Sequence, residues 1–158
     1  MNLCVIPARG GSKSIPKKNI RLLDGNPLLC HSIDYSLQSK LVNLTLVSTD
    51  SQEIANVAKE HGASVPFIRP TKFSQDLTKD YPVIRHTLDF FEAQGEIFDI
   101  YILLRPTSPL WPPGRGPRLP ERCARGPRST PCPFASGAVA WPSSFLPAPA
   151  VPPSVPLA

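Results

Sequence analysis

Proline is distributed unevenly along the 158-residue chain, and this distribution limits which part of the chain can fold as a packed domain. Residues 1–110 contain 8 of the 21 prolines, and residues 111–158 contain the other 13. Because proline lacks a backbone N–H and fixes φ, this density disfavours helices and central strands. We therefore expect residues 1–110 to form a folded domain and residues 111–158 to be a disordered tail with local polyproline II conformation.

Charge divides at the same point of the chain. Residues 1–110 carry 12 Lys and Arg against 11 Asp and Glu, a net charge of +1, whereas residues 111–158 carry 5 Arg against 1 Glu, a net of +4. A domain with a net charge of +1 implies no broad basic face of the kind that binds nucleic acid. We expect no nucleic-acid partner for the folded part.

Short apolar segments alternate with amphipathic ones through residues 1–110, which is typical of a parallel α/β sheet. The apolar runs that predict strands are residues 3–8, 44–50, 64–68 and 99–104. One helix is predicted to begin at Pro27, with Asn26 as its N-cap. Two further helices are predicted over residues 51–62 and 82–94. The expected inner face of the last helix consists of Val83, Ile84, Thr87, Leu88 and Phe91. The sequence therefore predicts a Rossmann-like, three-layer α/β fold with a parallel sheet.

Ligands of such sheets bind beyond the carboxyl ends of the strands, so the loops that follow the predicted strands are candidate binding segments. These loops are residues 9–19, 48–51, 69–80 and 105–110. The first contains four cations (Arg9, Lys13, Lys17 and Lys18) with no acid between them, together with Gly10 and Gly11. Glycines let backbone amides approach an anion closely, and fixed cations neutralise it, so this loop suits a triphosphate. A solvated basic loop is the alternative interpretation.

Several other polar residues have an ordinary structural interpretation. Asp50 ends a predicted strand and precedes a helix, which favours a helix N-cap over a metal ligand. Lys17 is expected to be solvated, and His31, His61 and His86 are expected to be surface or structural residues rather than catalytic ones.

The cysteines and the hydropathy pattern bear on the cellular compartment. Cys4, Cys30, Cys123 and Cys132 form no C-x-x-C pair, and the tail pair Cys123 and Cys132 has no nearby histidine to complete a zinc site. Cys4 and Cys30 lie in apolar stretches, which predicts buried thiols. No apolar run approaches the ~18–20 residues of a membrane span, and the N-terminus lacks the residue order of a signal peptide. We expect a reducing, cytoplasmic location and no membrane partner.

Four ordered segments of residues 3–110 resemble a known family. They read IPARGGSKSIPKKNIRLLDGNPLL, VSTDSQEIANVAKEHGA, RPTKFSQDLTKD and LLRPTSPL. In this order they resemble the cytidylyltransferases that activate acidic sugars, in particular the N-acylneuraminate cytidylyltransferases, also called CMP-sialic acid synthetases. The resemblance stops after Leu110.

The resemblance implies a role for particular residues. Arg9, Lys13 and Lys18 would be catalytic, by contacting the phosphates of CTP, and Asn19 would fix the loop or the nucleotide. Ala8 and the backbone of Gly10, Gly11 and Ser12 would line the nucleotide pocket. Arg69 and Asp76 would border the cytidine and sugar region, and Arg105, Thr107 and Ser108 would close the base and ribose side.

The resemblance also implies the reaction. The anomeric hydroxyl of a nonulosonic acid such as N-acylneuraminate would attack the α-phosphorus of CTP and release pyrophosphate, with Mg²⁺ as the cofactor. The carboxylates that bind Mg²⁺ in the family, most sugar contacts and the homodimer interface belong to a second half that we expect to be missing here, so no metal ligand is assigned. The alternative is a truncated, non-catalytic product that retains at most CTP binding.

The tail differs in composition from the rest of the chain. Pro, Ala, Arg, Gly and Ser supply 34 of its 48 residues, and it contains no Ile, whereas residues 1–110 contain ten. We hypothesise that the tail is GC-rich sequence translated in an alternative frame or from an alternative exon. Without the later strands of the family, residues 99–104 are expected to lie near an unprotected sheet edge.

Overall fold

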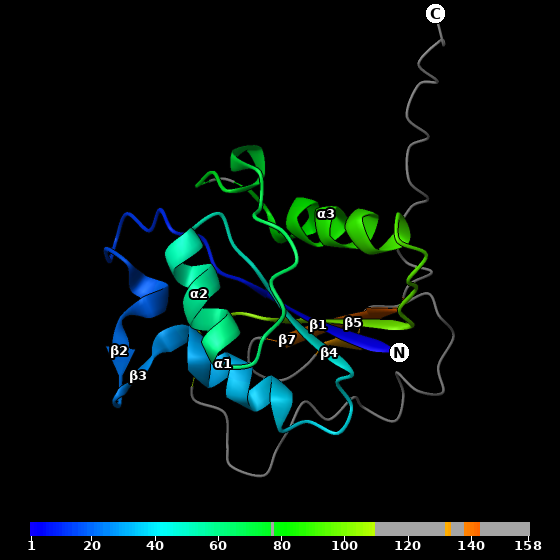
Figure 1. Cartoon of the computed structure of the whole chain (residues 1–158), viewed down its shortest axis with the longest axis horizontal. Coiled ribbons are helices and arrows are strands. Elements are labelled where there is room, and N and C mark those ends of the chain that lie inside the picture. The colour runs from blue at the N-terminus through cyan, green and yellow to red at the C-terminus, as the bar shows by residue number, and fades with distance from the viewer. Residues whose placement is uncertain (77, 110–131, 134–137, 143–158) are drawn as a thin grey trace, which may run out of the picture.

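Strands and helices alternate along the first part of the chain, as its hydrophobic pattern predicts (Figure 1). The computed structural model describes residues 1–76, 78–109, 132–133 and 138–142. The elements, in chain order, are β1 (Asn2–Pro7), the 3₁₀ turn η1 (Lys18–Ile20), β2 (Leu22–Leu23), β3 (Asn26–Pro27), α1 (Leu28–Leu37), β4 (Leu44–Ser48), α2 (Gln52–Glu60), the 3₁₀ turn η2 (Thr71–Phe73), α3 (Asp80–Glu92), β5 (Ile100–Leu104), β6 (Cys132–Pro133) and β7 (Ala138–Pro142).

The main sheet has the strand order β4-β1-β5-β7-β6. β1 lies between β4 and β5 and pairs in parallel with both: Leu3 is opposite Leu44 of β4 and opposite Tyr101 of β5. Figure 1 shows α3 over one face of these strands and α1 with α2 over the other. The predicted α/β fold with a parallel sheet between two helical layers is confirmed.

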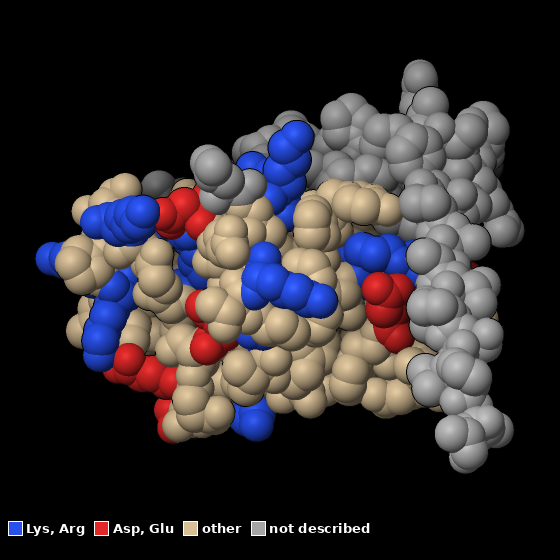
Figure 2. Space-filling model, turned by 90° about the horizontal axis from the view of Figure 1, so that it is seen from above, with Lys and Arg blue, Asp and Glu red and all other residues tan. Residues whose placement is uncertain are grey.

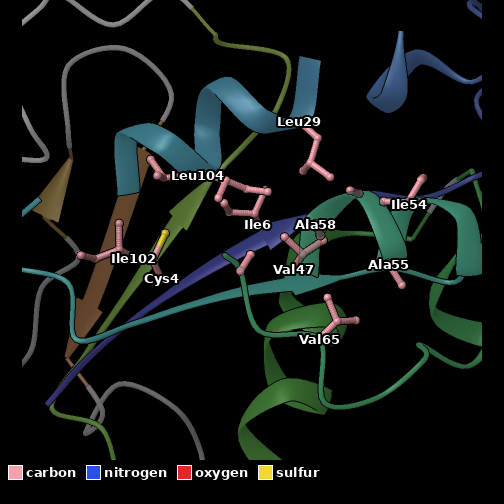
Figure 3. Close-up of a cluster of buried hydrophobic side chains, with 13 residues drawn as sticks. Cys4, Ile6, Leu29, Val47, Ile54, Ala55, Ala58, Val65, Ile102 and Leu104 are labelled. Atoms are coloured by element: carbon pink, nitrogen blue, oxygen red, sulfur yellow. The ribbon is translucent and has the colours of Figure 1, made fainter. Parts of the chain in front are cut away.

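The core consists of two apolar clusters, one on each face of the sheet. Consecutive residues of β1 divide between them, because side chains of a strand point alternately to opposite faces. Cys4 and Ile6 pack toward α1 and α2, whereas Leu3 and Val5 pack toward α3. Figure 3 shows the first cluster, with Ile6 among the side chains between the strands and the two helices. Burial on both faces explains why β1 is a continuous apolar run instead of an alternating one.

The cysteine prediction is confirmed for the two residues within the described domain. Cys4 and Cys30 are fully buried free thiols. Burial raises the pKa of Cys4 to about 12 and that of Cys30 to about 11, so both thiols stay protonated at neutral pH.

Two local predictions were wrong. Residues 64–68 form no strand: only Ser64 makes an isolated bridge to Leu46 of β4, because Pro66 has no N–H with which to continue a hydrogen-bonded ladder. Asn26 does not cap α1 either. It lies in β3, which pairs with β2 across a turn where Asp24 and Gly25 have positive φ values of 50° and 81°.

The outer edge of β5 is also paired, contrary to expectation. β7 runs antiparallel to β5, with Trp141 opposite Tyr101, so residues 99–104 do not lie at an unprotected edge. Residues 134–141 contain no proline, which leaves the backbone donors that a strand requires. β6 and β7 are thus short regular segments in a tail for which we expected none. The rest of the predicted disorder lies outside the described residues.

Candidate nucleotide-binding site

A pocket opens where β1 and β5 end, at the carboxyl edge of the parallel strands. It has a volume of about 220 Å³ and is formed by three of the four loops expected to bind ligand. Its lining residues are Pro7, Arg9, Ser12, Lys18, Asn19, Arg69, Phe73, Gln75, Asp76, Thr78, Asp80, Val83, Arg105, Pro106 and Thr107. Four cationic side chains therefore meet at this pocket: Arg9, Lys18, Arg69 and Arg105.

Backbone groups of the glycine-containing loop after β1 form hydrogen bonds with residues of the adjoining segments. The N–H of Ala8 donates to the carbonyl of Ser48 (2.9 Å), and the N–H of Gly10 donates to Asp50 Oδ1 (2.8 Å). Asn19 Nδ2 donates to the carbonyl of Arg9 (2.9 Å), which closes the loop from its far end. The loop is thus anchored at both of its ends by hydrogen bonds that involve no ligand.

Gly10 and Gly11 have different surroundings. A Cβ atom at Gly10 would lie 2.9 Å from Ser51 Cβ, whereas one at Gly11 would meet nothing within 4 Å. Gly10 is therefore required for the close approach of the loop to the start of α2. Its N–H is engaged by Asp50, and the contact between this backbone and a nucleotide stays a prediction.

Two cations of the loop share one carboxylate. Arg9 and Lys13 both form ion pairs with Asp76, which lies in the segment between η2 and α3. Hydrogen bonds from Lys13 and from Arg9 lower the pKa of Asp76. Lys13 is largely exposed and does not line the pocket. The basic loop and the segment 69–80 are therefore linked electrostatically across the pocket.

Arg69 is the buried cation of the pocket, with only 4% of its surface exposed. Its Nε donates to Ser74 Oγ (3.0 Å), and its Nη2 lies 3.9 Å from Asp50 Oδ1. Burial lowers the pKa of the Arg69 guanidinium, the charge of Asp50 opposes this shift, and the charge of Arg9 adds to it. A buried guanidinium with so few partners provides donors suited to an anionic group.

On the opposite side of the pocket, Arg105 follows β5 and forms an ion pair with Asp80 at the start of α3. Figure 2 shows the same mixture of charges over the surface, where acidic side chains lie beside several of the basic ones.

Comparison with known proteins agrees with this arrangement. Residues 3–113 match the cytidylyltransferase family. The chain belongs to this family. The match spans all the segments that form the pocket, and it confirms the resemblance that the four sequence motifs carry.

Curated cytidylyltransferases that the chain resembles act, by their names, on nonulosonic acids. The chain is 48% identical over 115 residues to the CMP-N,N'-diacetyllegionaminic acid synthase of Legionella pneumophila, covering 70% of this chain and 48% of that protein. It is 40% identical over 109 residues to the pseudaminic acid cytidylyltransferase of Campylobacter jejuni, covering 69% and 47%. It is 34% identical over 107 residues to the N-acylneuraminate cytidylyltransferase of Escherichia coli, covering 68% and 24%. The chain thus spans about half the length, or less, of the curated relatives it matches.

Solved cytidylyltransferase structures share the fold. The structure of CMP:2-keto-3-deoxy-manno-octonic acid synthetase complexed with CTP superposes with a TM-score of 0.59 at 24% identity, covering 71% of this chain and 42% of that one. A cytidylyltransferase of Leptospira borgpetersenii gives a TM-score of 0.51 at 25% identity, covering 68% and 42%. Each superposition covers less than half of the solved chain, so the shared region is again only part of the known protein.

Most of the predicted site residues line this pocket. Those that line it are Arg9, Ser12, Lys18, Asn19, Arg69, Asp76, Arg105 and Thr107. Five predicted residues do not line it: Ala8, Gly10, Gly11, Lys13 and Ser108. Ala8 is fully buried beneath the loop, and the N–H of Ser108 donates to the carbonyl of Arg105 (3.1 Å). Their predicted roles stay predictions.

Seven lining residues were not predicted to belong to the site: Pro7, Phe73, Gln75, Thr78, Asp80, Val83 and Pro106. Four of them, Phe73, Gln75, Thr78 and Asp80, lie in the RPTKFSQDLTKD segment. This motif therefore indicated which segment lines the pocket, but not which of its side chains point into the pocket. Pro7 and Pro106 flank lining arginines at the ends of β1 and β5.

The described residues form no preassembled metal site that would hold Mg²⁺ through protein side chains alone. They contain no group of three or more His, Cys, Asp or Glu side chains arranged to hold a metal ion. The two carboxylates that line the pocket, Asp76 and Asp80, are both ion-paired with cations. No step is therefore assigned to Mg²⁺ on these residues.

Proposed function

We propose that the pocket binds CTP and that it is the nucleotide-binding part of an enzyme that transfers CMP to an acidic nonulosonic sugar. The observation that carries this proposal is the convergence of four cations on one pocket at the carboxyl edge of a parallel sheet, within the residues that match the cytidylyltransferase family. A nucleoside triphosphate carries several negative charges, and clustered guanidinium and ammonium groups are the side chains that bind phosphates best.

The phosphates are assigned to the loop after β1. Arg9 and Lys18 line the pocket, and Lys13 joins Arg9 through the carboxylate of Asp76. Transfer of a nucleotidyl group depends mainly on positioning and on neutralising the charge of the leaving pyrophosphate. These cations supply that neutralisation, while Asn19 keeps the loop closed through the Arg9 carbonyl.

The cytidine is assigned to the opposite side of the pocket. Arg105 and Thr107 follow β5 and line the pocket together with the buried Arg69. With the base and ribose there and the leaving phosphates at the loop, the α-phosphorus is assigned to the space between these two groups of residues. The anomeric hydroxyl of the sugar acid attacks this atom, a new P–O bond forms, and the bond to the pyrophosphate oxygen breaks.

The sugar substrate is proposed only as a class. The relatives named above are enzymes of pseudaminic, legionaminic and N-acylneuraminic acids, which are all nonulosonic acids. The region shared with these relatives is the one that forms the nucleotide pocket, so the chemistry common to all three is assigned, and no single acid is preferred.

The remaining expectations have less support. Mg²⁺ and the loss of the family homodimer interface stay proposals that come from the family resemblance alone. The absence of a nucleic-acid partner stays a proposal that comes from the net charge of +1 on residues 1–110. We also propose a cytoplasmic location, because the buried thiols Cys4 and Cys30 suit a reducing compartment. None of the helices among the described residues is both long and apolar enough to cross a bilayer.

A second candidate function is CTP binding without catalysis. It is favoured by the extent of the match, because the chain spans 47–48% of the relatives named first above. The sheet and pocket of the shared region are present, whereas the part of the relatives beyond it has no counterpart in the match.

One experiment separates these candidates. The purified chain is incubated with CTP, Mg²⁺ and N-acetylneuraminate, and CMP-sugar and pyrophosphate are measured. Product formation supports the transferase and excludes the non-catalytic alternative. If no product forms, calorimetry with CTP decides whether the pocket binds the nucleotide at all.

Two variants make the binding test specific. Arg9→Ala removes a cation from the pocket and should weaken CTP binding about 10- to 100-fold, since a hydrogen bond to a charged group contributes about 1.5–3 kcal/mol. Lys40→Ala removes an equal charge from an exposed turn outside the pocket and should leave affinity unchanged. Equal affinities of the two variants would contradict the assigned site.

A further inference from the structure

Asp50 is the residue at this site whose position the expected helix-capping role does not explain. It follows β4 and precedes α2, but the N-cap of α2 is Ser51, and no side-chain hydrogen bond caps this helix. The Asp50 carboxylate instead accepts the N–H of Gly10 at 2.8 Å and lies 3.9 Å from Nη2 of Arg69. With 23% of its side chain exposed, it is turned mainly into the protein.

The backbone on either side of Asp50 contacts the same two partner segments. The carbonyl of Ser48 accepts the N–H of Ala8 at 2.9 Å, two residues before Gly10 in the chain. The carbonyl of Thr49 accepts the N–H of Arg69 at 2.7 Å. Residues 48–50 therefore join the loop after β1 to the segment that begins at Arg69, and the Asp50 carboxylate completes this junction from its side chain.

The charge of Asp50 and its contacts have opposite consequences for an anionic ligand. A carboxylate beside Arg69 reduces the positive potential that a phosphate meets. The same carboxylate fixes the backbone of the glycine loop and orients a buried guanidinium, which reduces the entropy lost on binding. Because the two effects have opposite signs, substitutions of Asp50 can separate them.

We infer that Asp50 is a positioning residue of the nucleotide site, which holds the Gly10 amide and the Arg69 guanidinium in the arrangement that receives the phosphates. It acts through these two residues and does not line the pocket itself. This inference rests on the proposed function, since it names what sets the geometry of the CTP pocket.

The test compares Asp50→Ala with Asp50→Asn in the full chain. Alanine removes the acceptor for the Gly10 N–H, whereas the asparagine side-chain oxygen can still accept it and carries no charge. Hydrogen exchange at the Gly10 amide reports the junction directly, and calorimetry with CTP reports its consequence. Glu53→Gln is the control, because it removes a carboxylate from the first turn of α2 that pairs with Lys17 and does not contact Gly10.

Asp50→Ala should accelerate exchange of the Gly10 amide and weaken CTP binding about tenfold, the loss expected for one well-made hydrogen bond to a charged group. Asp50→Asn should keep the amide protected and bind CTP at least as tightly as the wild type, since it keeps the contact and removes the repulsion. This rescue would not occur if Asp50 acted only through its charge. Glu53→Gln should leave the Gly10 amide as protected as in the wild type.

Two results would overturn the inference: unchanged Gly10 exchange in Asp50→Ala, or equal loss of CTP affinity in the alanine and asparagine variants. If Asp50→Ala does not fold, Asp50→Glu replaces it, because the extra methylene displaces the acceptor while the charge remains. A wild-type chain that fails to bind CTP refutes the proposed function, and the exchange of the Gly10 amide then still decides whether Asp50 holds the loop.

Discussion

Adding one methyl group at Gly10 should destabilise the protein, whereas the same change at Gly11 should not. In Gly10→Ala the new Cβ atom would lie 2.9 Å from Ser51 Cβ and 3.5 Å from Ser51 Oγ. Carbon atoms pack favourably at about 3.5–4.0 Å, so either the loop or the start of α2 must move. Ser51 Cβ is attached directly to the helix backbone and cannot rotate away.

The cost follows from this overlap. Inserting a methyl group into a well-packed contact costs about 1–3 kcal/mol. For a chain of this size such a loss lowers Tm by about 2–12 °C. Movement of the loop also strains the hydrogen bond from the Gly10 N–H to Asp50, so CTP affinity should fall together with stability.

Thermal unfolding followed by circular dichroism measures the effect in three variants. Gly11→Ala is the matched control, because its Cβ would meet nothing within 4 Å and Gly11 does not have a positive φ. Gly10→Ala combined with Ser51→Gly removes the clashing atom, and glycine at an N-cap costs only a few tenths of a kcal/mol. Most of the lost stability should return in this double variant. A Gly10→Ala protein as stable as the wild type, or a double variant less stable than Gly10→Ala, would refute the reasoning.

Three further predictions concern stability. Ion pairing lowers the pKa of Asp76 below its ordinary 3.8, so its contribution is complete above that pH and is lost as the pH falls further; when unfolding by urea is measured between pH 7 and 2.5, the free energy of unfolding should fall less on acidification in Asp76→Asn than in the wild type. Burial lowers the pKa of His86 from 6.5 where it packs against two phenylalanine rings, so stability should fall as the pH drops below 6.5, and His86→Phe should reduce this fall between pH 7 and 5. Phe98 is 2% exposed in an aromatic cluster, and Phe98→Ala should cost about 3–5 kcal/mol by equilibrium unfolding; a loss under 1 kcal/mol would contradict this packing.

Hydrophobic periodicity was sufficient to predict the elements that carry a strong apolar pattern. The inner face of α3 is buried as expected, at Val83, Ile84, Thr87, Leu88 and Phe91. The continuous apolar runs gave β1, β4 and β5, because burial on both faces of a parallel sheet requires such runs. The predicted strand at 64–68 failed because a short apolar run that contains Pro66 cannot complete a ladder, although Ser64 at its start still bonds to β4.

The candidate site was predictable as a set of loops but not as a set of contacts. The rule that ligands bind at the carboxyl ends of parallel strands located the segments around Arg9, Arg69 and Arg105. The sequence could not show that the Asp50 side chain bonds to Gly10 instead of capping α2. The same carboxylate can fill either role, and tertiary packing decides between them. Nor could it distinguish Gly10 from Gly11, since only the position of Ser51 makes one of them indispensable.

The central claim is that CTP binds in the pocket at the carboxyl ends of β1 and β5. A titration of the ¹⁵N-labelled chain with CTP, followed by NMR, tests it most directly because every backbone amide of the pocket reports separately. The account predicts saturable shifts that concentrate at Arg9, Lys18, Asn19, Arg69 and Arg105, the residues that line the pocket from three separate segments. No shifts at millimolar CTP, or shifts confined to residues outside these segments, would contradict it.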